Sequence, residues 1–227
     1  MKSPLNLIKS LLAVAGVAAL SAVSAAPASA FNFSNIAGGD MVGDAYQGNF
    51  GFTVENQGGL AVFNIFNFGN PGASDMFIAG VFFDDNGTLS SSSAPWTNVN
   101  NVGKVGFTFN GGLSNAQLPQ GGKNFTTDYA FFSDNGDGNG LAVQANEKVG
   151  FAFAASYNNV LAALTSGDLK IGLHVQGLPN GASDSYISSN IGNTENTPEP
   201  LTMLAAGAAV GFGTMFKKQR DRAQKAE

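Results

Sequence analysis

Carboxylates are the most numerous side chains in this chain that could perform catalysis. Glycoside hydrolysis needs only two acids at a suitable separation, and residues 31–197 contain thirteen Asp and Glu. Asp84 and Asp85 precede Asn86-Gly87, however, and Asp134 lies in another Gly-rich stretch, positions where Asp favours turns. We expect no acid inside an aromatic strand, where burial would raise its pKa for acid catalysis. A carboxylate-based hydrolase therefore ranks below a structural role.

Histidine and cysteine chemistry is limited by number. His174 is the only His and Cys is absent, which excludes a thiolate or two-His zinc site. A Ser-His-Asp relay would have to pass through His174, yet residues 31–197 contain no Gly-x-Ser-x-Gly motif. We interpret His174 as a surface or edge-strand residue and predict a protein that is not an enzyme, with no catalytic or cofactor-binding residue.

The best metal candidate is a Gly-rich loop that resembles the start of a calcium loop. Asn135, Asp137 and Asn139 could supply oxygen ligands, with Gly140 at the sixth place. The first ligand is Asn rather than Asp, and Asn146 occupies the twelfth place instead of Glu. A hairpin connection is the default interpretation, and we assign no metal ligand while leaving calcium open.

Trp96 is the only Trp, and an exposed Trp can stack on a sugar ring. A groove formed by Trp96 and Tyr129 and rimmed by Asp134 and Asp137 would favour polysaccharide binding. A single Trp after a serine tract can equally cover the edge of the core. The sequence leaves both possibilities open.

The elements that would position these residues are mainly strands. Residues 31–197 contain seventeen Phe and twenty-six Gly, a mixture that favours aromatic strands joined by tight turns. Apolar or alternating segments predict strands at residues 49–54, 60–66, 76–83, 104–109, 129–132, 141–145, 148–154 and 169–176. We expect an all-β fold, a single β-sandwich of jelly-roll or Ig-like type with about eight strands.

One short helix interrupts this pattern. Asn158 or Asn159 could cap its start and Gly167 its end. In the strand that follows, Leu169, Ile171, Leu173 and Val175 should face the core. The segments KVGFTF (residues 104–109) and KVGFAF (residues 148–153) are similar in sequence, and this similarity predicts two similar core strands of one domain.

Charge restricts the partners of the body, residues 31–190. Residues 31–197 carry thirteen acids, four Lys and no Arg, a formal charge of −9. Such a surface repels phosphate backbones, so we expect no nucleic-acid partner. The length suffices for one domain with its own core.

The two ends of the chain read as targeting segments. Residues 1–30 carry Lys2 and Lys9, an apolar stretch and then Ala28-Ser29-Ala30, the pattern of a signal peptide cut between Ala30 and Phe31. Near the other end, residues 191–200 form a linker, and residues 201–216 are a sixteen-residue apolar run of roughly 24 Å as a helix. The basic tail, residues 217–227, favours the cytoplasmic side. We therefore predict an N-terminal signal helix and a C-terminal transmembrane helix.

The C-terminal sequence TPEPLTMLAAGAAVGFGTMFKKQRDRAQKAE resembles the sorting signal of PEP-CTERM proteins, in the form typical of cyanobacterial members. The resemblance implies that an exosortase, a membrane-embedded peptidase, recognises Pro198, Glu199 and Pro200 and cuts nearby. Residues 158–187 and 82–89 also resemble blocks found in secreted members without an assigned activity.

We therefore expect an exported surface protein with a structural role, associated with extracellular matrix or exopolysaccharide. The secretion machinery and an exosortase would be its partners, and extracellular polysaccharide a further one. Before processing, the C-terminal helix would hold the body outside the cytoplasmic membrane; afterwards the body would reach the cell surface or be secreted. The alternative is a calcium-assisted carbohydrate-binding module, followed by the hydrolase.

Overall fold

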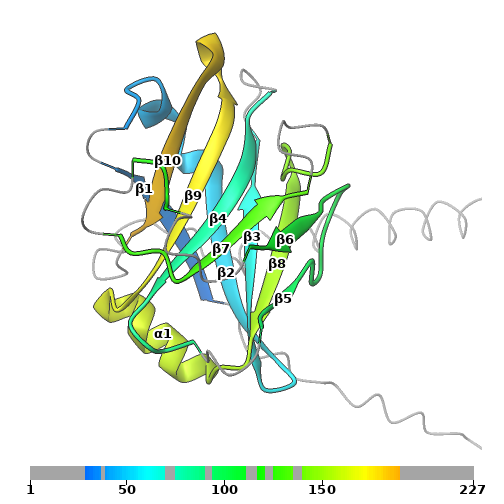
Figure 1. The fold of residues 1–227 in the computed structure, drawn as a ribbon, viewed down its shortest axis with the longest axis vertical. Coiled ribbons are helices and arrows are strands. Elements are labelled where there is room, and N and C mark those ends of the chain that lie inside the picture. Colours follow the sequence, from blue (N-terminus) through cyan, green and yellow to red (C-terminus); the bar gives the residue numbers. More distant parts are fainter. Residues whose placement is uncertain are drawn as a thin grey trace, which may run out of the picture.

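The computed structural model describes residues 29–36, 39–69, 75–89, 94–110, 117–120, 125–134 and 140–189. Within them the chain forms strands β1 (Ser29–Asn35), β2 (Phe50–Gln57), β3 (Leu60–Asn67), β4 (Phe77–Asp85), β5 (Trp96–Thr97), β6 (Phe107–Phe109), β7 (Tyr129–Ser133), β8 (Glu147–Phe153), β9 (Leu169–Leu178) and β10 (Ala182–Ser188). The helical elements are η1 (Gly43–Asn49), α1 (Tyr157–Ser166) and η3 (Pro179–Gly181). The all-β class is thus confirmed (Figure 1).

The strands form one sheet in the order β5-β8-β3-β2-β1-β10-β9-β4-β7-β6, and all paired neighbours are antiparallel. Strand β1 belongs to both halves of this sheet. Its first residues pair with β2, as in Phe31 opposite Phe52, and its last residues pair with β10, as in Phe33 opposite Ser188. The change of partner lets the sheet curl around its own inner face.

A side chain joins the two ends of the curled sheet. Asn98 follows β5 with a positive φ of 60°. Its side-chain amide makes the two hydrogen bonds that the backbone of a neighbouring strand residue would make. Its Nδ2 donates to the Phe107 carbonyl at 2.8 Å, and its Oδ1 accepts from the Phe107 N–H at 2.8 Å. The result is a nearly closed barrel, and the predicted sandwich is not confirmed.

The interior of the barrel is filled with phenylalanine. The alternation of the strands sends Phe63, Phe131, Phe151 and Phe153 inward, each with at most 1% of its surface exposed. The rings of Phe131 and Phe151 lie 4.3 Å apart between centroids, and Phe83 meets Phe153 at 5.0 Å. Aromatic pairs at these separations add to the free energy gained by apolar burial.

Helix α1 and the 3-10 helix η1 lie toward opposite ends of the barrel in Figure 1. Val160, Ala163 and Leu164 of α1 are buried in the core. The helix begins after Ser156, not at the predicted Asn158 or Asn159 cap, and ends as predicted at Gly167, whose φ is 82°. Glycine adopts this left-handed conformation without a steric penalty.

Most predicted strands are confirmed, with specific exceptions. Residues 141–145 form only an isolated bridge, Ile78 to Val143, and residues 104–106 lie outside β6. Strands β1, β5 and β10 were not predicted. The inward faces of β8 and β9 are confirmed, including Leu173 and Val175.

The predicted signal helix lies within residues 1–30, of which only Ser29 and Ala30 are described, as the start of β1, and the predicted transmembrane helix, residues 201–216, lies outside the described residues. No helix in the described ranges has the length and apolar character needed to cross a membrane.

Candidate functional site

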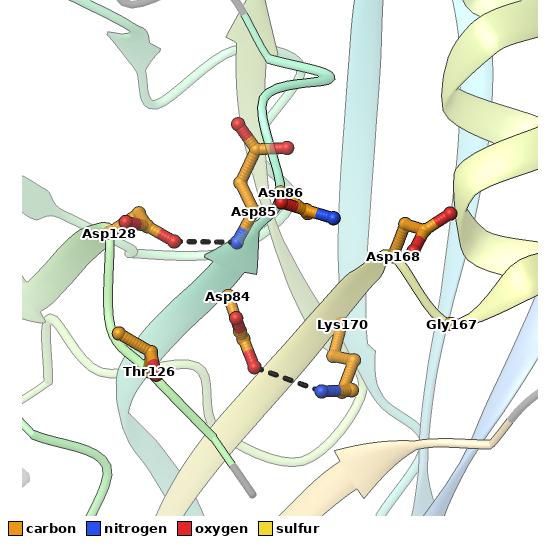
Figure 2. A pocket seen from close by; sticks show the side chains of 8 residues that line it. All are labelled: Asp84, Asp85, Asn86, Thr126, Asp128, Gly167, Asp168 and Lys170. Carbon is orange, nitrogen blue, oxygen red and sulfur yellow. Dashed lines mark hydrogen bonds and ion pairs between the residues drawn. The ribbon is translucent and has the colours of Figure 1, made fainter.

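The described part of the chain contains an open hollow of about 650 Å³ beside the ends of β4 and β9. Figure 2 shows its lining residues: Asp84, Asp85, Asn86, Thr126, Asp128, Gly167, Asp168 and Lys170. Four of these are acids and one is a base, so the hollow is polar and mainly acidic. It brings together the predicted pair Asp84 and Asp85 with Asp128 and Asp168, which the sequence analysis did not single out.

Asp84 and Lys170 form an ion pair across two neighbouring strands. They are opposite residues of β4 and β9, and Lys170 Nζ lies 3.1 Å from Asp84 Oδ2. Figure 2 shows the two side chains pointing toward each other, whereas the Asp85 carboxylate points away from them. The pair is partly exposed, and contacts of this kind contribute little net stability. Asp84 is therefore held beside a cation at the wall of the hollow.

Asp85 organises the turn that follows β4. Its Oδ1 accepts from the Thr88 N–H at 2.8 Å, and its Oδ2 accepts from the Leu89 N–H at 3.0 Å. Burial raises the pKa of Asp85, and the nearby Asp128 adds to the rise, although the backbone N–H groups oppose it. The predicted turn-forming role of Asp85 is confirmed.

The other two acids of the hollow also hold backbone or neighbouring groups. Asp128 Oδ2 accepts from the Asp85 N–H at 2.7 Å, drawn as a dashed line in Figure 2. Asp168 Oδ2 accepts from the Ser166 hydroxyl at 2.7 Å, just after α1. Every carboxylate of the hollow thus has a donor. Within the described residues, no group of three or more His, Cys, Asp or Glu side chains could hold a metal ion.

His174 lies on a central strand of the sheet and is half-buried, so the edge-strand alternative of the prediction is wrong. Strand β9 pairs with both β10 and β4, which places His174 between Ser185 and Gly80. Burial lowers the pKa of His174. The Ser185 hydroxyl opposite it is buried and has no hydrogen-bond partner in the described part of the chain, so the two residues do not form a hydrogen-bonded Ser-His pair.

The aromatic residues proposed for sugar stacking are separated. Tyr129 is buried against Phe153 in the core, whereas 47% of Trp96 is exposed. Trp96 and Tyr129 therefore do not line a common groove. A different exposed ring was missed by the sequence analysis. Phe68 is 55% exposed and stacks on Phe66 at 5.7 Å with an interplanar angle of 8°.

The remaining predicted sites lie partly outside the described residues. Pro198, Glu199 and Pro200 lie outside the described residues, as do Asn135, Asp137 and Asn139. Ala30 and Phe31, the predicted cleavage residues, lie within β1 opposite Thr53 and Phe52.

The expectation that no acid lies inside an aromatic strand is wrong for Asp184. It stands in β10 two residues before Tyr186 and is 1% exposed. Burial raises its pKa, and Asp44 and Asp40 raise it further. The polar sequence around Asp184 gave no signal of burial.

No family model, curated protein or solved structure matches this chain.

Proposed function

We propose that this protein is an exported PEP-CTERM surface protein whose folded barrel serves a structural or matrix-associated role outside the cytoplasmic membrane. The C-terminal sequence carries this proposal: Pro198, Glu199 and Pro200, then an apolar run, then a basic tail. Proline on both sides of Glu199 disfavours helix there and keeps the backbone extended for a peptidase.

The positions of the two ends of the body support this route. Ser189, the last described residue before the linker, lies beside Asn32, the second residue of the predicted mature chain. The Ser189 N–H donates to the Asn32 carbonyl at 3.1 Å, and the Ser189 hydroxyl donates to the same oxygen at 3.1 Å. The chain thus enters and leaves the barrel at neighbouring positions, as expected if the signal peptide and the C-terminal helix engage one bilayer.

The hollow supports a structural role over hydrolysis. Asp85 and Asp128 hold backbone N–H groups, and Asp84 holds Lys170. A glycosidase needs one carboxyl group free to protonate the leaving oxygen and a second free to attack or to activate water. The hydrogen bonds instead engage these side chains in the turn after β4 and in a cross-strand ion pair.

The sorting proposal is tested by replacing Pro198, Glu199 and Pro200 with Ala in the source cell. We expect the body to remain in the membrane fraction as the uncleaved form, because the peptidase loses its recognition segment. Replacing Asn193, Thr194 and Glu195 with Ala is the matched control, and its processing should match that of the wild type. Normal release of the first variant would refute the proposal.

Polysaccharide binding is a second candidate, favoured by the exposed rings of Trp96 and Phe68. Phe68 lies over Gly51, where an added Cβ would come within 2.9 Å of the ring. If the body binds glycan through these faces, Trp96→Ala and Phe68→Ala should each reduce retention on a polysaccharide column, by roughly tenfold in affinity for each stacked sugar. Met41→Ala, at an 85% exposed residue, is the control. Equal retention of all three variants would exclude this mode.

A further inference from the structure

Asp184 is a buried carboxyl group with one satisfied and one unsatisfied oxygen. Its Oδ1 accepts from the N–H groups of Ser185 at 2.8 Å and Asp40 at 3.2 Å. Its Oδ2 is buried and has no hydrogen-bond partner among the described residues. A buried carboxylate oxygen without a donor is costly, because ionised groups lose their hydration on burial.

Gly39, before η1, and Gly43, the first residue of η1, pack closely against this carboxyl group. A Cβ built on Gly39 would lie 2.3 Å from Asp184 Oδ1, and one built on Gly43 would lie 2.0 Å from Oδ2. The Gly43 carbonyl also accepts from the Tyr186 hydroxyl at 2.9 Å. Residues 39–43, which we call the latch loop and which include the first residue of η1, are therefore fastened to β10 through Asp184 and Tyr186.

Burial favours the neutral form of Asp184 and is the largest influence on its pKa, although the backbone N–H groups of Ser185 and Asp40 favour the ionised form. Asp40 lies in the latch loop and Asp44 in η1, and both carry negative charge toward Asp184. Tyr186 on β10 is uncharged near neutral pH, because burial raises the pKa of its hydroxyl further above its ordinary value. On the β9 side Asp184 stands opposite the apolar Val175.

Another buried oxygen in this part of the sheet lacks a hydrogen-bond donor. Asn35 of β1 stands opposite Tyr186, and its Oδ1 is a second buried oxygen without a partner in the described part of the chain. An ionised Asp184 would add another acceptor and a charge. A protonated Asp184 would instead supply a donor and remove the repulsion from Asp40 and Asp44.

We propose that Asp184 is a proton-controlled latch: its neutral carboxyl group holds the latch loop and η1 against the end of the barrel, and ionisation releases them. On release the proton passes to solvent, and water reaches the carboxylate as the loop moves away. This inference concerns the barrel itself and stands independently of the proposed function.

The sign of the pH dependence follows from the direction of the shift. Burial and the neighbouring acids raise the pKa of Asp184 in the folded state above its unfolded value. The stabilisation is therefore complete below the unfolded pKa, about 3.9, and is lost as the pH rises through the folded pKa. Wild-type protein should be more stable in mild acid than at neutral pH as far as this group is concerned.

The test compares the full-length wild type with Asp184→Asn in mild detergent from about pH 4 to about pH 8. Asparagine keeps the shape and cannot ionise. We expect the melting temperature of the wild type to fall by roughly 3 °C or more over this range relative to the variant. The control, Asp134→Asn, removes a charge from an exposed residue and should keep the pH dependence of the wild type.

Hydrogen exchange provides a second measurement that does not depend on the stability of the variant. After correction for intrinsic rates, the Asp40 and Gly43 amides of the wild type should lose protection as the pH rises, while those of β9 keep it. Identical pH profiles for wild type and Asp184→Asn would overturn the proposal. So would stabilisation by millimolar calcium that disappears in Asp184→Asn, since a cation would then occupy the place assigned to the proton.

Discussion

At the scale of single residues, close packing against glycine explains several buried polar contacts. Gly43 is buried, and its missing side chain leaves the space that the Asp184 carboxyl group fills. Gly48, in the same 3-10 helix, has no heavy atom within 4 Å of the position of an added Cβ. The two glycines share an element and differ in their surroundings, so they form a natural pair for mutation.

Gly43→Ala should lower the free energy of unfolding by about 1–3 kcal/mol, because the new methyl group would overlap Asp184 and displace it or the loop. Gly48→Ala should change it by less than about 0.5 kcal/mol. Thermal or urea denaturation of both variants measures the difference. Equal stabilities would mean that Asp184 does not fill the space beside Gly43.

At the scale of elements, the barrel depends on how β5 meets β6. One side chain makes a two-point contact here, because Asn98 offers both a donor and an acceptor to the backbone of Phe107. Asn100, two residues later, also has a positive φ, 54°, but its side chain donates to Gln57 Oε1 in an exposed hydrogen bond of 3.1 Å. The backbone strain of an Ala substitution is therefore similar at both positions, and of these two side chains only that of Asn98 binds the backbone of β6.

Asn98→Ala should lower stability by about 1–3 kcal/mol and increase hydrogen exchange at the Phe107 amide, whose acceptor is removed. Asn100→Ala should cost less and leave that amide protected. Denaturation together with site-resolved exchange checks both statements. Continued protection of Phe107 in Asn98→Ala would show that β5 and β6 stay together without this side chain.

At the scale of the whole molecule, the path of β1 determines the architecture. This strand pairs with β2 at its start and β10 at its end, so residues more than 150 positions apart become neighbours. The same pairing places Asn32 beside Ser189, where the chain leaves the barrel. The nearly closed barrel and the adjacent ends therefore have one structural cause.

A double variant, Asn32→Cys with Ser189→Cys, should form a disulfide on mild oxidation, because a 3.1 Å backbone hydrogen bond next to the paired residues Phe33 and Ser188 holds the two positions side by side. The chain has no Cys of its own, so the product is unambiguous on a non-reducing gel. Thr108→Cys with Ser189→Cys is the control and should remain reduced, since Thr108 lies on β6 at one end of the strand order. Failure of the first pair to cross-link would contradict the docking of β1 on β10.

Local patterns predicted much of the sheet. Alternating apolar residues located β2, β3, β4, β8 and β9, and Gly87 of the Asn86-Gly87 turn sequence has a positive φ of 83°. The turn-forming role of Asp85 also followed from its neighbours in the sequence. These features were predictable because strand alternation and turn conformation depend on residues close together in the chain.

The closure of the barrel and the environment of Asp184 depended on the tertiary structure. Strand β10 has a polar sequence, and Asp184 and Ser185 became buried only because β1, β9 and the latch loop pack around them. Residues 141–145 alternate like a strand, yet they meet the sheet at one bridge. The sequence by itself therefore determined the all-β class and the local turns, whereas strand partners and burial arose from contacts between distant residues, which no local periodicity encodes.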